Sequence, residues 1–298
     1  MSSPPLDREE YIEQAYFFRV YRERLEQSIA AQEILHSIRE EVLSTTKLPM
    51  AIDFLKGELL LHGRVSEGMS LLPHYFTSFQ AFVMKQAEED RGSFDLRMAL
   101  LILEREAEYR AAQPTPQGLF VYQFKCVSRN KLGYDRGFQA MSEDPLYDSD
   151  WRDWILKCRL ILGTVDFADI IYLRSEQALL DQRRQQANPE FQTQQTLLFG
   201  TKEGRIAKAN RGKDPLFMFA ALQRQLAYPA VPRPIRNVET HLSPAAFEAR
   251  LRLLEKRLQL VDAEVKGNLD LSQFFVQGEG GVPRPKFPVD PPLDAPSS

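Results

Sequence analysis

The chain has 298 residues, of which 43% are hydrophobic and 27% are charged, and its formal net charge is −3. This balance is typical of a soluble globular protein, with enough apolar side chains for one large or two modest domains. No apolar run approaches the ~18 residues that a membrane helix needs, and the acidic N-terminal residues do not resemble a secretory signal. We therefore expect a cytoplasmic protein with no membrane partner, in which the two cysteines, Cys126 and Cys158, are buried reduced thiols.

The sequence predicts a mainly α fold that begins with an N-terminal helical bundle at residues 1–162. Asp7 followed by Glu10 predicts a capping box at the first helix, whose aromatic residues cover more than one face. Apolar periodicity and start and stop signals then predict helices at 31–42, 49–63, from 77 or 78 to near 92, from 93 to about 111, and at 117–130, 134–141 and 149–162.

The pattern changes after Gly163, where we predict a small α+β unit at residues 163–228. Short β-branched and aromatic runs at 169–174 and 196–199 are typical of strands, and the turn residues that follow predict a β-hairpin between 196–199 and 205–209. The pattern at 178–183 fits a strand or a helix equally. Asp214 and Pro215 then start a predicted helix that ends at Tyr228.

A heptad pattern near the C-terminus is the most specific feature of the chain. A Pro-rich linker at 229–242 leads to a predicted coiled-coil-like helix at 243–266, bounded by Ser243, Pro244 and Gly267. The residues at its a and d positions form a self-association seam: Phe247, Leu251, Leu254, Leu258, Val261 and Val265. Charges of opposite sign flank the seam and would pair between two parallel copies: Arg250 with Glu255, and Arg257 with Asp262.

Two interpretations of this helix stay open. It could join copies of the chain into a dimer or another homo-oligomer, or it could pack on its own domain through a face widened by Leu253 and Leu260. After it, residues 267–276 form an apolar docking segment, in which 269–275 would bind the protein's own body or a protein partner. The composition of residues 277–298 predicts a disordered Pro-rich tail.

The search for chemistry yields no catalytic, cofactor-binding or metal-binding residue to which we assign a role. Glu33 and His36 have the spacing of one half of a bundle di-metal site, but a second copy of the motif is missing from the sequence. Neither cysteine has a histidine nearby in sequence, although catalytic partners need not be sequence neighbours. An enzyme with an unrecognised site in the helical bundle is therefore kept as a lesser alternative.

A basic cluster at 201–213 is a candidate anion-binding site. It consists of Lys202, Arg205, Lys208, Arg211 and Lys213, with Glu203 as its single acid. Basic side chains on a projecting hairpin can neutralise the phosphates of a nucleic acid, and Gly204 and Gly212 would let the backbone approach a ligand. The competing interpretation is a solvated loop that docks on the acidic helical domain.

The stretch from Leu198 to Pro215, together with Tyr228–Pro234, resembles an uncharacterised bacterial protein family. The resemblance extends from about Arg8 to Phe275 and implies no activity, cofactor or catalytic residue. From the sequence as a whole we expect a non-catalytic assembly or adaptor protein that self-associates through residues 247–265. The alternative is a nucleic-acid-binding protein that uses the basic cluster.

Overall fold

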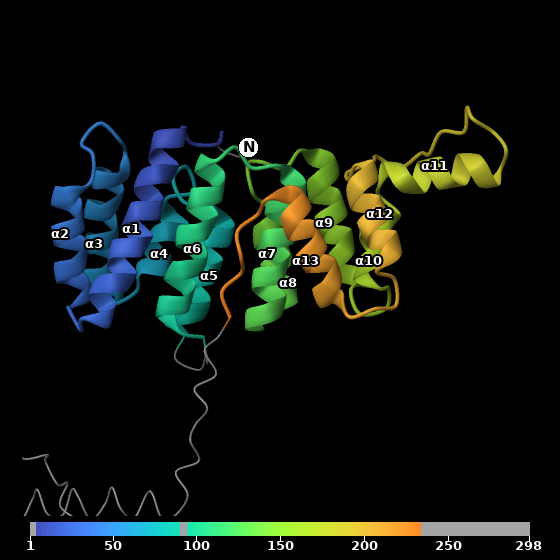
Figure 1. The fold of residues 1–298 in the computed structure, drawn as a ribbon. Coiled ribbons are helices and arrows are strands. Elements are labelled where there is room, and N and C mark those ends of the chain that lie inside the picture. Colours follow the sequence, from blue (N-terminus) through green and yellow to red (C-terminus); the bar gives the residue numbers. More distant parts are fainter. Residues whose placement is uncertain (1–3, 90–93, 234–298) are drawn as a thin grey trace, which may run out of the picture. The chain divides into compact units, whose positions relative to one another are not determined.

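A computed structural model of the chain describes residues 4–89 and 94–233 (Figure 1). The chain divides into two compact units, Met1–Ile235 and Arg236–Ser298, and all the described residues belong to the first. The predicted linker is described only as far as residue 233. The heptad helix, its seam and flanking pairs, the docking segment and the tail lie outside the described residues.

Residues 4–89 and 94–233 form thirteen α-helices and no β-strand, which confirms the mainly α fold (Figure 1). The helices are α1 (Arg8–Glu26), α2 (Ala31–Glu41), α3 (Leu48–His62), α4 (Val65–Leu71), α5 (Ser78–Glu88), α6 (Leu96–Ala111), α7 (Pro116–Asn130), α8 (Tyr134–Ser142), α9 (Ser149–Ile161), α10 (Phe167–Tyr172), α11 (Glu176–Gln185), α12 (Thr201–Ala209) and α13 (Pro215–Leu226). Among these, α1 packs against α6, α2 against α3, α5 against α8, and α10 against α12. No helix in the described part combines the length and hydrophobicity that crossing a membrane requires.

Several predicted helix boundaries are confirmed. They could be predicted because capping residues act on backbone groups within one turn of the helix end. The Thr77 hydroxyl accepts from the Gln80 N–H at 3.3 Å, and the Gln80 side chain accepts from the Thr77 N–H, which completes a capping box at α5. Asp214 accepts from the N–H of Leu216 at 2.9 Å and starts α13. Gly63 ends α3 with φ of 71°, a left-handed conformation that glycine adopts without steric cost.

The capping box predicted at α1 is wrong, because Glu10 turns away from its own helix end. Asp7 occupies the N-cap position without a side-chain hydrogen bond. The Glu10 carboxylate instead accepts from the N–H of Lys47 at 2.9 Å, and Glu13 accepts from the N–H of Leu43 at 2.9 Å. Both glutamates therefore hold the connection between α2 and α3 against α1, a role that depends on tertiary packing.

The predicted β-hairpin and the strand predicted at 169–174 are also wrong. Residues 169–172 lie in α10, the ambiguous stretch at 178–183 lies in α11, and most of the supposed hairpin is α12. Phe199 pairs as a strand residue would, but only in an isolated bridge with Ser175. Burial of an amphipathic face overrides the β-propensity of so short a run, because helices in proteins are stabilised mainly by tertiary packing.

Gly204 explains why α12 can pack closely on the residues that begin α11. A Cβ atom at this position would lie 2.2 Å from the Ser175 Oγ and 2.6 Å from the Gln177 Cβ. Ser175 cannot easily move, since its hydroxyl donates to the carbonyl of Tyr172 at 2.6 Å and caps α11. This glycine therefore serves helix packing, and not the backbone approach to a ligand that the sequence predicts.

An aromatic cluster connects α7 with the helices that follow it. The Phe120 ring on α7 is fully buried and lies 4.7 Å from Trp154, 5.9 Å from Trp151, 6.3 Å from Phe167 and 6.4 Å from Phe199, measured between centroids. These partners come from α9, from α10 and from the residues before α12. Phe120 is therefore the point at which segments far apart in sequence share one core.

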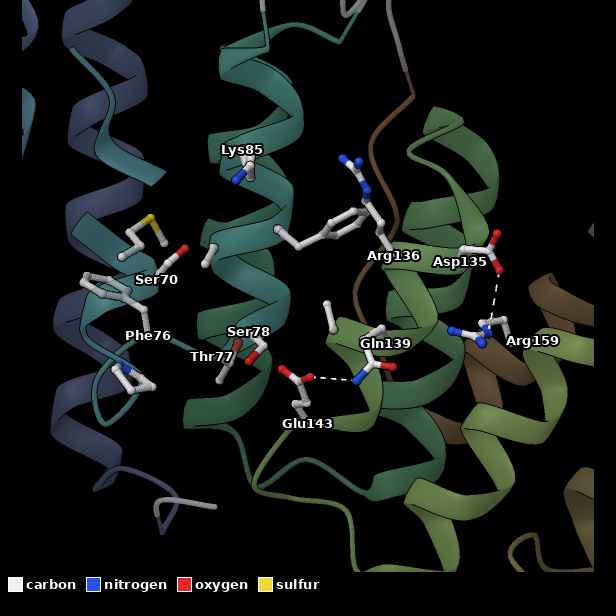
Figure 2. A pocket seen from close by; sticks show the side chains of 15 residues that line it. Ser70, Phe76, Thr77, Ser78, Lys85, Asp135, Arg136, Gln139, Glu143 and Arg159 are labelled. Carbon is white, nitrogen blue, oxygen red and sulfur yellow. Dashed lines mark hydrogen bonds and ion pairs between the residues drawn. The ribbon is translucent and has the colours of Figure 1, made fainter. Parts of the chain in front are cut away.

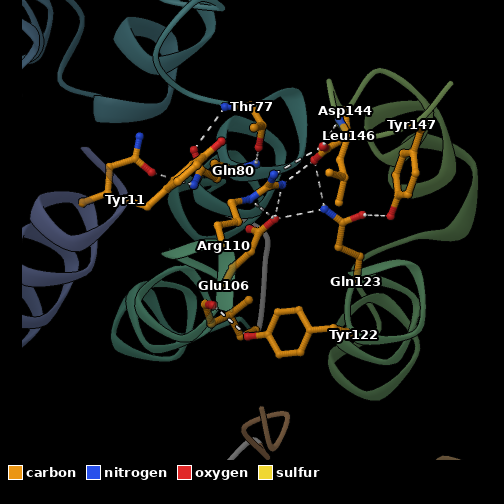
Figure 3. Close-up of polar contacts among 12 residues, drawn as sticks. Tyr11, Thr77, Gln80, Glu106, Arg110, Tyr122, Gln123, Asp144, Leu146 and Tyr147 are labelled. Atoms are coloured by element: carbon orange, nitrogen blue, oxygen red, sulfur yellow. Dashed lines mark hydrogen bonds and ion pairs between the residues drawn. The ribbon is translucent and has the colours of Figure 1, made fainter. Parts of the chain in front are cut away.

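A buried polar network joins α6, α7 and the connection between α8 and α9 (Figure 3). Arg110 forms ion pairs with Glu106, at 2.7 Å, and with Asp144. The Gln123 amide donates to the same Glu106 oxygen at 2.9 Å, and the Tyr147 hydroxyl donates to Gln123 at 3.1 Å. Both carboxylates are completely buried, so one guanidinium faces two acids away from solvent. Burial raises the pKa of Glu106, with a smaller contribution from Asp144, and Arg110 only partly opposes this.

Candidate functional site

Two of the five predicted anion-binding side chains, Lys208 and Arg211, form ion pairs with carboxylates of the protein itself. Lys208 Nζ lies 2.7 Å from an Asp181 oxygen, and its hydrogen bond is the main cause that lowers the pKa of Asp181. Arg211 lies 2.5 Å from Asp169, and its guanidinium lies 3.9 Å from the centre of the Tyr172 ring.

The remaining members of the cluster do not form a joint site with these. Arg205 donates to the side chain of Gln177 at 3.0 Å. Lys202 on α12 and Lys213 in the turn before α13 are exposed. Since these side chains are spread along a helix and a turn, they do not project together from a hairpin. Nucleic-acid binding by 201–213 stays a prediction.

An open groove of about 680 Å³ lies between α5 and α8 and is extended by residues of α4 and α9 (Figure 2). Its floor is apolar, with the buried side chains of Met69, Phe76 and Ala81 beside Phe82 on the α5 side and Ala140 on the α8 side. Small residues at 81 and 140 leave room between the two helices. An apolar floor of this size is typical of a binding site.

Charged side chains form the rim of this groove. Figure 2 shows Lys85 and Arg136 nearer one end, and Thr77, Ser78 and Glu143 nearer the other. The order of residues along α5 and α8 agrees, because Lys85 lies late in α5 and Arg136 lies early in α8. Arg159 adds a third cation and lies 3.7 Å from Asp135.

The ion pairs of the rim cations are exposed and long. Lys85 lies 3.4 Å from Glu67, with side-chain exposures of 46% and 41%, and Arg136 lies 3.5 Å from Glu89, with exposures of 74% and 39%. Exposed pairs of this kind contribute little free energy, so both cations can exchange these partners for a ligand's carboxylates. The rim therefore favours a ligand with acidic groups at the Lys85 end.

A second surface feature is an exposed apolar stripe on α3. Met50, Phe54 and Leu61 lie on one face of this helix, and their exposed fractions are 69%, 37% and 76%. Leu60 beside them is 60% exposed. Several large exposed apolar side chains on one short helix can mark a region that another chain covers.

Sequence reasoning missed the groove although it located the helices that build it. The expected helices starting at 77 or 78, and at 134–141 and 149–162, are α5, α8 and α9. The faces they turn toward one another depend on Gly137, where an added Cβ would lie 3.0 Å from Val127 of α7 and 3.6 Å from Phe82. The sequence signal that could have indicated a groove was the pair of alanines at 81 and 140 beside phenylalanine at 82. Such residues are as common in closed cores as they are in grooves.

The described residues define a mainly helical protein with an open, charge-rimmed groove. In the part of the chain that the structure describes, no group of three or more His, Cys, Asp or Glu residues is placed to hold a metal ion. No protein-family model matches the chain, and no curated protein or solved structure matches it. This result is consistent with the resemblance to a family without an assigned activity, and the bacterial origin of that family stays a prediction.

Proposed function

We propose that this protein is a non-catalytic assembly or adaptor protein that binds an acidic amphipathic segment of a partner in the groove between α5 and α8. The observation that carries the proposal is the apolar floor between α5 and α8 combined with the cations Lys85 and Arg136 at one end. Helix-in-groove recognition uses this combination, since apolar anchors provide affinity and rim charges provide orientation. The exposed stripe on α3 supports the same functional class.

The partner chemistry is tested by selecting peptides from a displayed library of amphipathic helices on the purified full-length protein. We expect enrichment of peptides with an apolar face and carboxylates near one end. In fluorescence anisotropy, the double variant Lys85→Glu with Arg136→Glu should bind the selected peptides about tenfold more weakly, because two attractive contacts become repulsive. Both side chains are exposed, so the fold should tolerate the changes.

Lys157→Glu is the matched control for this experiment. Lys157 is an exposed lysine of α9 that does not line the groove, so its reversal changes the net charge by as much as either single reversal in the double variant without touching the site. Binding to this variant should equal binding to the wild type. A library that yields no binder, or peptides that bind the Lys85/Arg136 double variant as tightly as the wild type, would contradict the proposal.

Self-association through the seam from Phe247 to Val265 is the second part of the proposal, and it is supported by the heptad spacing and the flanking charges alone. Sedimentation equilibrium of the full-length protein should show an oligomer at tens of micromolar, and Leu254→Asp should shift it to the monomer because a charge would be buried in the seam. A wild type that remains monomeric at these concentrations removes this part of the proposal.

A further inference from the structure

A second, smaller cavity lies between α7, α13 and the segment that follows α13. Its volume is about 290 Å³. The segment after α13 is held in place because Arg129 of α7 donates to the carbonyl of Val231 at 3.4 Å and Arg105 of α6 donates to the carbonyl of Ala230. Figure 1 shows this segment, in orange, running back along α6 and α7.

Three cations converge on this cavity, and none of the described residues that line it is a carboxylate. Lys125 and Arg129 are one helical turn apart on α7 and share a face, and Arg233 approaches from the segment. The other five lining residues are neutral: Leu216, Ala220, Gln223, Ala230 and Val231. The cavity therefore has a strongly positive potential that its own lining does not neutralise.

Lys125 is the member of this group that a purely structural role explains least well. It is only 7% exposed, and its Nζ lies 3.3 Å from the Gln223 side-chain oxygen. The rings of Phe219 and Tyr228 lie 5.8 and 5.4 Å from the ammonium group, which is favourable for a cation but leaves its charge uncompensated. Lysine is seldom buried to this degree without an anionic partner.

The neighbouring positive charges add to the cost of keeping this cavity empty. Burial lowers the pKa of Lys125, and the charges of Arg129 and Arg233 lower it further. Burial and Arg233 likewise lower the pKa of Arg129. An anion in the cavity would relieve the repulsion among all three groups.

We propose that this cavity binds the phosphate group of a small organic phosphate monoester. A phosphate monoester carries close to two negative charges at neutral pH and matches the fork geometry of arginine. Leu216, Ala220 and Val231 supply an apolar wall against which the organic part of the ligand can pack. The small volume favours a metabolite-sized ligand over a nucleic acid chain.

The experiment is isothermal titration calorimetry on the full-length protein with two probes, inorganic phosphate and phenyl phosphate, at constant ionic strength maintained with chloride. We expect saturable binding of both, with phenyl phosphate binding more tightly because its ring contacts the apolar wall. Lys125→Met, Arg129→Gln and Arg233→Gln should each weaken binding by about tenfold or more, the effect of losing one charge-assisted hydrogen bond. Acetate, with a single charge, should bind much more weakly than phosphate.

Arg224→Gln is the control, because Arg224 is an exposed cation of α13 that does not line the cavity. Its phosphate affinity should change less than twofold. Thermal unfolding without ligand checks the fold of each variant, and Arg233→Gln carries the test if Lys125→Met fails to fold, since Arg233 is exposed. The proposal is overturned if wild type shows no saturable phosphate binding or if Arg224→Gln loses as much affinity as the cavity variants. Equal affinity for inorganic and phenyl phosphate overturns the assignment to an organic monoester.

Discussion

Replacing Arg110 with methionine is expected to lower the free energy of unfolding by about 3–5 kcal/mol. The substitution puts an apolar side chain of similar length in the same place but removes the only cation of the network drawn in Figure 3. Glu106 and Asp144 are both fully buried, and without Arg110 they would face each other with only the amide of Gln123 between them. The penalty is the cost of an uncompensated buried charge, and urea denaturation followed by circular dichroism measures it.

Two controls separate lost charge pairing from lost packing in this experiment. Adding Glu106→Gln and Asp144→Asn to Arg110→Met should restore most of the stability, because a neutral network of the same shape has no charge left to compensate. Arg97→Met removes an exposed ion pair with Asp95 and should leave the urea midpoint unchanged. An unchanged midpoint in Arg110→Met would contradict the buried ion-pair account.

The pH dependence of this network has a definite sign. Because the pKa of Glu106 is raised in the folded protein, the Glu106 carboxylate binds a proton more tightly in the folded state than in the unfolded state. The contribution of Glu106 to stability is therefore present below its unfolded pKa and is lost as the pH rises through its folded pKa. Glu106→Gln has no proton to lose, so its stability relative to the wild type should increase as the pH rises above the ordinary pKa of a glutamate.

The second large effect is expected for Phe120→Ala, which should cost about 3–5 kcal/mol of unfolding free energy. Phe120 is fully buried, and its five aromatic neighbours cannot fill the cavity without moving α9 or α10. The only two tryptophans of the chain, Trp151 and Trp154, are among these neighbours, so tryptophan fluorescence reports directly on the site of the change.

The same variant tests whether the segments before and after α9 unfold together. Fluorescence and far-ultraviolet circular dichroism should give the same, lowered urea midpoint, because the aromatic cluster belongs to one cooperative core. Phe217→Ala, at the exposed start of α13 where the ring is 66% exposed, is the control and should change stability by about 0.5 kcal/mol or less. Two separate transitions, with only the fluorescence transition displaced, would show that the core is divided.

Local sequence signals were sufficient to predict a helix boundary wherever the residues that begin or end the helix lie within one turn of that boundary. Thr77 with Gln80, Asp214 with Pro215, and Gly63 each contribute their effect through the adjacent backbone, so their boundaries could be predicted without knowledge of the fold. The apolar face of α2 is a similar case, because Ile34, Leu35 and Ile38 are all completely buried. A period of 3.6 residues is a property of the sequence itself.

Predictions failed where the sequence left two partners or two conformations nearly equal in energy. Glu10 could cap its own helix or the backbone at Lys47, and only the packing of α1 beside the α2–α3 connection decided between them. Residues 201–209 have turn and basic residues compatible with a hairpin, but the fit of Gly204 against Ser175 stabilises a helix there. The contacts responsible lie 25 or more residues away in sequence.

The sequence by itself therefore determined the mainly α fold, most helix boundaries and the faces that some helices bury, because these depend on backbone hydrogen bonds and side chains within a few residues. The tertiary structure alone decided which helices meet across the groove, that Glu106 and Asp144 share Arg110, and that Lys125, Arg129 and Arg233 surround one cavity. Each of these arrangements joins elements distant along the chain, and its energy depends on burial and charge separation that exist only once those elements have packed.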